Sequence, residues 1–189
     1  MKKKLFREYL WIFSSLYLIL GLFNILFAWL GLICFIVPLL ISLLGGGKKY
    51  CNEFCGRGQL LDLLGKKLKL SRKKTMPRFF VSKYFRYGFL TFFLFMFFNM
   101  LISTYLVFKG TNSLKEVITL LWTFKLSWKL NGLTNVSPWI TQFAFGFYSL
   151  MLTSTLLGII TSILYKPRSW CIYCPMGTMT QGICKLKNK

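Results

Sequence analysis

The stretch LWIFSSLYLILGLFNILFAWLGLICFIVPLLISLL, residues 10–44, runs for 35 residues without a charged side chain. A helix that crosses the ~30 Å hydrocarbon core of a bilayer needs about 20 residues, so this stretch is too long for one crossing and suits two short ones. Basic residues flank it on both sides, at positions 2–7 and from position 48 onward. Because basic residues favour the cytoplasmic side, both flanks belong there. The stretch therefore predicts a helical hairpin that turns near residues 24–31.

Two further uncharged stretches, residues 88–108 and 143–165, are each long enough to span a bilayer. With them the sequence predicts an all-α integral membrane protein, a single membrane domain of four transmembrane helices in two hairpins, with both termini in the cytoplasm. The expected spans are about 8–26, 28–45, 87–108 and 142–165, with cytoplasmic loops at 46–86 and 166–189. This topology leaves only four of the 25 basic residues outside, namely Lys109, Lys115, Lys125 and Lys129.

The external loop, residues 109–141, contains the segment SLKEVITLLWTFKLSWKL, residues 113–130. Its apolar residues Leu114, Val117, Ile118, Leu121 and Trp122 recur at helical spacing, and tryptophan is enriched at membrane–water boundaries. We therefore expect an amphipathic helix that lies in the interface.

Composition excludes several kinds of function. Of the 189 residues 55% are hydrophobic, and the net charge of +21 is concentrated between the apolar stretches, which argues for a membrane and against nucleic acid as the partner. The basic residues of positions 65–86 suit anionic lipid head groups, with docking of an acidic electron carrier as the alternative. Histidine is absent and only four residues are acidic, so haem held by histidine, common zinc hydrolase sites and carboxylate-lined ion paths are excluded or disfavoured.

Six cysteines remain as the chemically capable side chains, and four of them form two close pairs. Cys51 and Cys55 lie in GGGKKYCNEFCGRGQLLDLLG, residues 45–65, and Cys171 and Cys174 lie in KPRSWCIYCPMGTMTQGIC, residues 166–184. Each pair follows a predicted hairpin and precedes a glycine-containing turn. The two pairs thus emerge on one membrane face, as in a weak internal duplication of a two-helix unit.

Two cysteine pairs on one face provide four thiolate ligands for a metal or an iron–sulfur cluster, and the cytoplasmic placement disfavours structural disulfides. Cys51, Cys55, Cys171 and Cys174 are the predicted ligands, and Cys184 is a candidate for an extra one. A 4Fe–4S cluster is the expected cofactor; zinc and a redox-active dithiol relay stay open as alternatives. Nearby basic residues should favour the thiolate form, namely Lys48, Lys49, Arg57, Lys166 and Arg168.

At these motifs the sequence resembles the membrane-bound 4Fe–4S proteins associated with nitrate and nitrous oxide reductases. The resemblance rests on the following residues: Lys49, Tyr50, Cys51, Cys55, the LLDLLG and TMPRFF segments, Trp170, Cys171, Cys174, Pro175, Gly177 and Thr178. Gly56 replaces the proline of the family's Cys-x-x-x-Cys-Pro motif, and two residues instead of three separate Cys171 from Cys174. The chain corresponds to a short form without the C-terminal ferredoxin modules.

The resemblance implies electron transfer to or from a partner redox enzyme or the quinone pool, in the cytoplasmic membrane of a bacterium. Such a component needs no acid, base or nucleophile of its own, and it is an electron carrier more than a stand-alone enzyme. Its partners would be membrane lipids and a redox protein or quinone, with an oligomer also open. The rival functions are a zinc- or thiol-based redox sensor or assembly factor, and a small membrane transporter or structural subunit.

Overall fold

The computed structural model describes residues 9–44, 54–67, 69–72, 74–115, 117–120, 124–127 and 136–187. Their elements follow in chain order: α2 (Leu10–Phe23), η1 (Ile25–Trp29), α3 (Leu30–Leu43), α4 (Gly56–Lys66), α5 (Arg78–Val81), α6 (Lys83–Phe108), β1 (Val117–Leu120), β2 (Phe124–Ser127), α7 (Pro138–Leu164), η3 (Ser169–Ile172) and α8 (Pro175–Lys187). The fold is mainly helical, as the sequence predicts.

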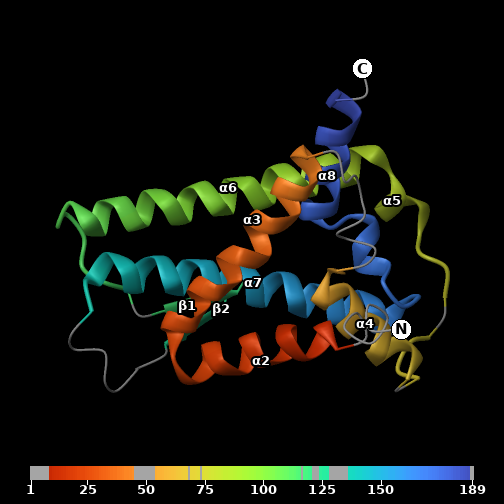
Figure 1. Cartoon of the computed structure of the whole chain (residues 1–189), viewed down its shortest axis with the longest axis horizontal. Helices are drawn as coiled ribbons and strands as arrows, with labels where there is room; N and C mark the ends of the chain where they lie inside the picture. Colours follow the sequence, from red (N-terminus) through yellow and green to blue (C-terminus); the bar gives the residue numbers. More distant parts are fainter. Residues whose placement is uncertain are drawn as a thin grey trace.

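The long helices run between two ends of the molecule (Figure 1). The starts of α2 and α6 and the ends of α3 and α7 lie at one end, together with α4, α5 and α8. We call this end the motif end, because both cysteine motifs belong to it. The turn between α2 and η1, the end of α6 and the start of α7 lie at the opposite end.

Three helical segments are long and apolar enough to cross a membrane: Ile25–Leu43, Lys83–Phe108 and Pro138–Leu164. The described part of α2 is apolar but has only 14 residues, so it falls short of this length. Large apolar side chains stand exposed along α2, α3 and α6, among them Phe13, Ile33 and Phe95. An outward apolar surface of this extent suits lipid as the surrounding solvent.

Helix α7 is the core of the bundle. In its most apolar 18 residues 67% are buried, against 17% in α6. Tyr148 and Phe145 of α7 pack with Ile25 and Ala28 of η1, while Phe147 belongs to a second cluster that includes Met96 and Met100 of α6. Small residues allow this close approach: a Cβ built at Gly146 would lie 2.3 Å from Met100 Cγ. Helices in membranes use small residues in this way, because close packing is their main source of association energy.

The first apolar stretch turns at Asn24. Helix α2 ends at Phe23, Asn24 has an extended backbone, and its side chain accepts a hydrogen bond of 3.0 Å from the backbone N–H of Leu26. The amide thereby caps η1, which satisfies one of the donors that a helix start leaves unpaired. The local break separates α2 from the η1–α3 segment.

The expected interfacial helix at residues 113–130 is wrong where the structure describes it. Residues Val117–Leu120 and Phe124–Ser127 instead form an antiparallel pair, with Ile118 opposite Leu126. Val117, Ile118 and Thr119 are β-branched and favour an extended backbone, and helix and strand periodicity are hard to distinguish over so short a segment. Burial of Ile118 and a hydrogen bond of 3.1 Å from Thr119 N to Ser149 Oγ join β1 to α7.

We predict that Gly21→Ala destabilises the bundle. A Cβ at this position would lie 2.3 Å from Cε2 of the rigid, buried Tyr148 ring, and such overpacking costs about 1–3 kcal/mol. The midpoint of thermal unfolding in detergent should fall. Gly88→Ala in α6 is the matched control, because a Cβ there meets no atom within 4 Å. Equal midpoints for the two variants would show that the α2–α7 contact is looser than described.

Candidate metal centre

Cys55 stands directly before α4 and caps it. Its backbone is extended, and its Sγ accepts a hydrogen bond of 3.4 Å from the backbone N–H of Gly58. Its carbonyl oxygen accepts a second bond, from Gln59 N. The sulfur is thus held at the first turn of a helix, where backbone N–H groups stabilise negative charge. Cys51, its predicted partner, lies outside the described residues.

Gly56, the first residue of α4, explains one departure from the family motif. A Cβ at this position would lie 2.7 Å from the backbone oxygen of Leu10 in α2. Proline carries a Cβ as well, so the proline of the motif would collide with the backbone of α2. The glycine lets α4 approach the start of α2 closely.

The second pair lies beyond the end of α7. Cys171 belongs to η3, and Cys174 directly precedes Pro175, the first residue of α8. The turn is held by backbone bonds from Cys171 N to Arg168 O and from Cys174 N to Trp170 O, both 2.9 Å long. Arg168 has a left-handed backbone, with φ of 62°, which turns the chain back toward α4.

Both motifs are joined by a cluster of buried side chains at the motif end. Leu61 of α4 packs with Trp170 and Tyr173, and all three are almost completely buried. Gly158 of α7 allows this contact, because a Cβ there would lie 3.3 Å from Leu61 Cδ1 and 3.4 Å from Trp170 Cγ. At Gly65 a Cβ would come within 2.8 Å of Pro167. Helix α4 therefore docks tightly against the segment that carries the second pair.

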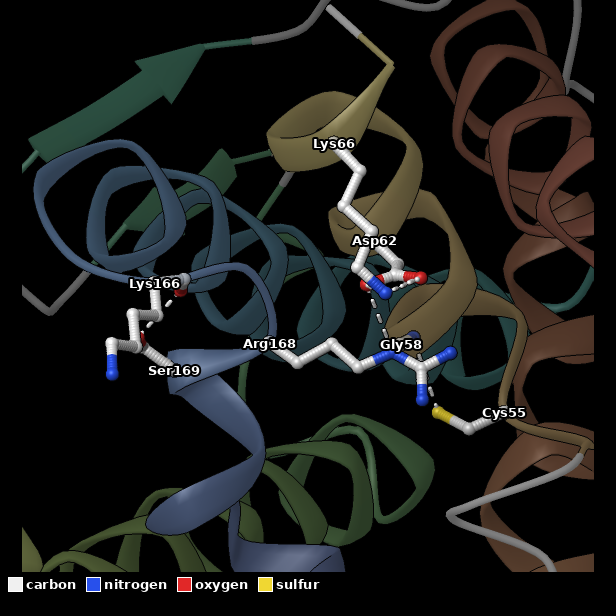
Figure 2. Close-up of polar contacts among 7 residues, drawn as sticks. All are labelled: Cys55, Gly58, Asp62, Lys66, Lys166, Arg168 and Ser169. Atoms are coloured by element: carbon white, nitrogen blue, oxygen red, sulfur yellow. Dashed lines mark hydrogen bonds and ion pairs between the residues drawn. The ribbon is translucent and has the colours of Figure 1, made fainter. Parts of the chain in front are cut away.

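A polar contact reinforces this docking. Asp62 of α4 accepts a hydrogen bond of 3.0 Å from Lys66, and the guanidinium of Arg168 lies 3.6 Å from the same carboxylate (Figure 2). Figure 2 also shows Ser169, whose hydroxyl donates to the carbonyl oxygen of Lys166 at 2.6 Å. Arg168, expected from the sequence to act on a thiolate, is thus engaged with Asp62.

The docking brings sulfur atoms from the two halves of the chain together. A Cβ built at Gly58 would lie 3.7 Å from Cys55 Sγ and 3.8 Å from Cys171 Sγ, so both sulfurs border the space that the missing side chain leaves. Cys55 and Cys171, two of the four predicted ligands, therefore lie beside Gly58, a residue that sequence reasoning did not single out.

Burial disfavours the thiolate form of Cys174. Desolvation raises the pKa of its thiol, and Cys55 raises it further, while N–H groups of Gly177 and Met176 and the charge of Arg57 act in the opposite direction. Arg57 acts on this thiol in the direction that the sequence analysis expects of basic neighbours, but loss of water has the larger effect. A bound metal ion would displace this proton.

Arg57 reaches from α4 into the bundle. Its Nη1 donates a hydrogen bond of 2.6 Å to Ser154 Oγ in α7, and its Nη2 contacts the sulfur of Met151. The side chain bridges α4 and α7, and its charge opposes the rise in the pKa of Cys174. Lys48 and Lys49, the other basic residues before α4, lie outside the described residues.

Cys184 lies apart from this arrangement along α8. Its Sγ is 3.4 Å from the hydroxyl of Ser42 in α3, and that hydroxyl donates to the carbonyl oxygen of Thr180. Ten residues of helix separate it from Cys174, which corresponds to about 15 Å of rise. We therefore leave Cys184 out of the ligand set proposed below.

The chemistry of the donor set fits a metal held by thiolates. None of the five described cysteines forms a disulfide. Among the described residues no three potential ligands already stand at metal-holding distance, so the described cysteines alone do not form a closed site. Sulfur-only ligation suits iron–sulfur clusters and zinc, and Cys55 and Cys171 both lie beside Gly58.

Comparison with known families distinguishes these metals. Two segments, residues 27–77 and 149–189, match the family model described as the 4Fe-4S binding domain. Each segment contains one of the cysteine pairs, in agreement with the internal duplication inferred from the sequence. No curated protein and no solved structure matches the chain. In both halves the chain is therefore similar to 4Fe–4S binding domains, which supports a 4Fe–4S cluster as its cofactor.

Proposed function

We propose that this chain is a membrane electron carrier whose 4Fe–4S cluster is ligated by Cys51, Cys55, Cys171 and Cys174. Electrons would pass between a partner redox protein or the quinone pool and the cluster. The gathering of Cys55 and Cys171 around Gly58 carries the proposal, because these cysteines come from the two segments that separately match the 4Fe-4S binding domain.

A bound 4Fe–4S cluster supplies one-electron transfer. The chain's own residues hold it and adjust its surroundings. The N–H groups of Gly58 and Gly177 point at cysteine sulfurs, and such bonds stabilise the more negative, reduced state. Trp170, Tyr173 and Leu61 keep water from the side of the site that faces the bundle. No acid, base or nucleophile is required of the protein.

The membrane setting of the proposal rests on the three apolar helices and on charge. The segment between α4 and α6, which includes Lys67 and Arg72, lies at the motif end. By the positive-inside rule this end faces the cytoplasm, so the site would exchange electrons at the cytoplasmic surface of the cell membrane. Both termini would lie on the same side.

Particular observations test the two rival functions. A zinc or thiol-based sensor would use the same cysteines, and metal content distinguishes it from the proposed carrier. A transporter would need a polar path through the bundle, and Arg57 reaches Ser154 of α7 there. However, the cavity that Ser154 lines has a volume of only about 10 Å³, the size of one water molecule, so it offers no path for a solute.

Replacing Cys55 and Cys171 together by serine should abolish the cluster. Anaerobically purified wild-type protein should contain iron and acid-labile sulfide and give an EPR signal after reduction with dithionite, and the double variant should lose all three. Cys184→Ser is the matched control and should retain them, because Cys184 packs against Ser42 on α3. Colourless wild-type protein that contains zinc, or no metal, would refute the proposal in favour of the sensor.

Arg57→Gln should lower the reduction potential of the cluster. A nearby positive charge stabilises the more negative reduced state, and its removal at an effective dielectric constant of about 20 should shift the potential by roughly 50 mV. Redox titration followed by EPR measures the shift. Arg57→Lys should recover most of it, and Arg72→Gln, which removes an exposed charge, should change little. Equal potentials for Arg57→Gln and the wild type would show that the guanidinium has no electrostatic effect on the cluster.

The orientation predicts opposite behaviour of reporters at the two ends of the molecule. A fluorescent protein fused after residue 189 should fold and fluoresce in the cytoplasm. Alkaline phosphatase inserted after Thr111, beyond the end of α6, should be active, because that enzyme needs an oxidising compartment. Exchange of the two reporters should silence both, and active phosphatase at residue 189 would invert the proposed topology.

A further inference from the structure

A cavity at the motif end lies between the start of α6 and the outer part of α8. Its volume is about 260 Å³, and it is lined by Lys83, Arg86 and Tyr87 of α6 and by Gln181 and Lys185 of α8. Three of these five side chains are cationic. None of the five is a cysteine or one of the residues that pack around Gly58, so the cavity is separate from the candidate metal centre.

The cationic side chains of this cavity lack an acidic partner. Asp62 is the sole acidic residue in the part of the chain that the structure describes, and it pairs with Lys66 and Arg168. Arg86 donates to Gln181 Oε1 at 2.6 Å, which fixes its guanidinium in the wall of the cavity. Its Nε is buried and has no hydrogen-bond partner among the described residues. A buried donor of this kind needs a water molecule or an anion as its acceptor, and the positive charge around the cavity favours an anion.

The backbone at the start of α6 also contributes positive potential to the cavity. Lys83 is the first residue of α6, a helix of 26 residues, and the preceding Ser82 makes no side-chain cap. The start of a long helix favours an anion, because its first N–H groups are unpaired and its dipole is positive there. The cationic side chains and the start of α6 therefore both favour a negatively charged ligand.

The surface beyond the cavity indicates where the anion comes from. Tyr87, Phe95, Phe98, Ile102 and Tyr105 stand exposed at intervals of three, four or eight residues, so they form one apolar stripe along α6 that starts at the cavity. A phosphate bound at Lys83 and Arg86 would place acyl chains along this stripe. A free phosphate ion would make no use of it.

We propose that this cavity binds the phosphate group of an anionic phospholipid of the membrane leaflet at the motif end. Arg86 and Lys83 hold the phosphate, Lys185 adds charge from α8, and the acyl chains follow the stripe on α6. The lipid would connect α8 to α6 at the membrane surface. The site does not depend on the cluster or on the proposed electron transfer.

Lipid titration of the full chain in detergent tests the proposal. Delipidated protein receives phosphatidylglycerol, phosphatidylcholine or inorganic phosphate, and native mass spectrometry and thermal unfolding report binding and stabilisation. Phosphatidylglycerol should bind and raise the unfolding midpoint, whereas the other two should have little effect. Inorganic phosphate that protects as well as phosphatidylglycerol would overturn the lipid as the source of the anion.

A pair of matched double variants localises the site. Lys83→Gln/Arg86→Gln should weaken phosphatidylglycerol binding by about tenfold or more, which corresponds to 1.4 kcal/mol. Arg72→Gln/Lys74→Gln removes the same charge from exposed positions outside the cavity and should bind as the wild type does. Equal weakening in both variants would show that binding depends only on the net charge of the protein, and it would refute the site. Iron and sulfide content should stay unchanged in both, which separates this result from the proposed function.

Discussion

The contact of Leu61 with Trp170 across Gly158 is the interaction on which the candidate metal centre depends. It packs α4, from the first half of the chain, against η3, from the second half, and the small residue of α7 between them allows the approach. Cys55 lies six residues before Leu61, and Cys171 directly follows Trp170. An apolar contact thereby fixes the relative position of two sulfur atoms. The contact of Asp62 with Arg168 secures the same docking at its solvent side.

Basic residues have different roles at the surface and inside the bundle. At the surface many basic residues are exposed, and the proposed orientation places most of them on the cytoplasmic side. Arg57 instead reaches a hydroxyl of α7, where a cation is costly unless a partner or a negative group compensates it. A thiolate-bound cluster with net negative charge would provide that compensation. The same placement would make the guanidinium effective in adjusting a redox potential, because few water molecules screen it.

The apolar stretches and cysteine motifs carry most of what the sequence could predict. Uncharged length predicted the long helices, and the two pairs pointed to a 4Fe–4S cofactor, which the family match supports. The hairpin of β1 and β2 was missed, because Val117 and Ile118 satisfy helical spacing while their branched side chains favour a strand. Gly58 and Ser154 were missed for a different reason. Their importance arises from contacts with residues about 95 to 115 positions away, namely Arg57 with Ser154 and Gly58 with Cys171, which no local pattern records.

The division of the thiols between the two halves has a consequence for biogenesis. Cys55 leaves the ribosome more than one hundred residues before Cys171, and α6 and α7 are synthesised in between. In the proposed orientation the first pair would face the cytoplasm without its counterpart during that interval. With all four proposed cysteines as ligands, delivery of a cluster would have to follow synthesis of the last spanning helix and of the second motif. A translation arrest between the two motifs would leave an inserted but cluster-free fragment.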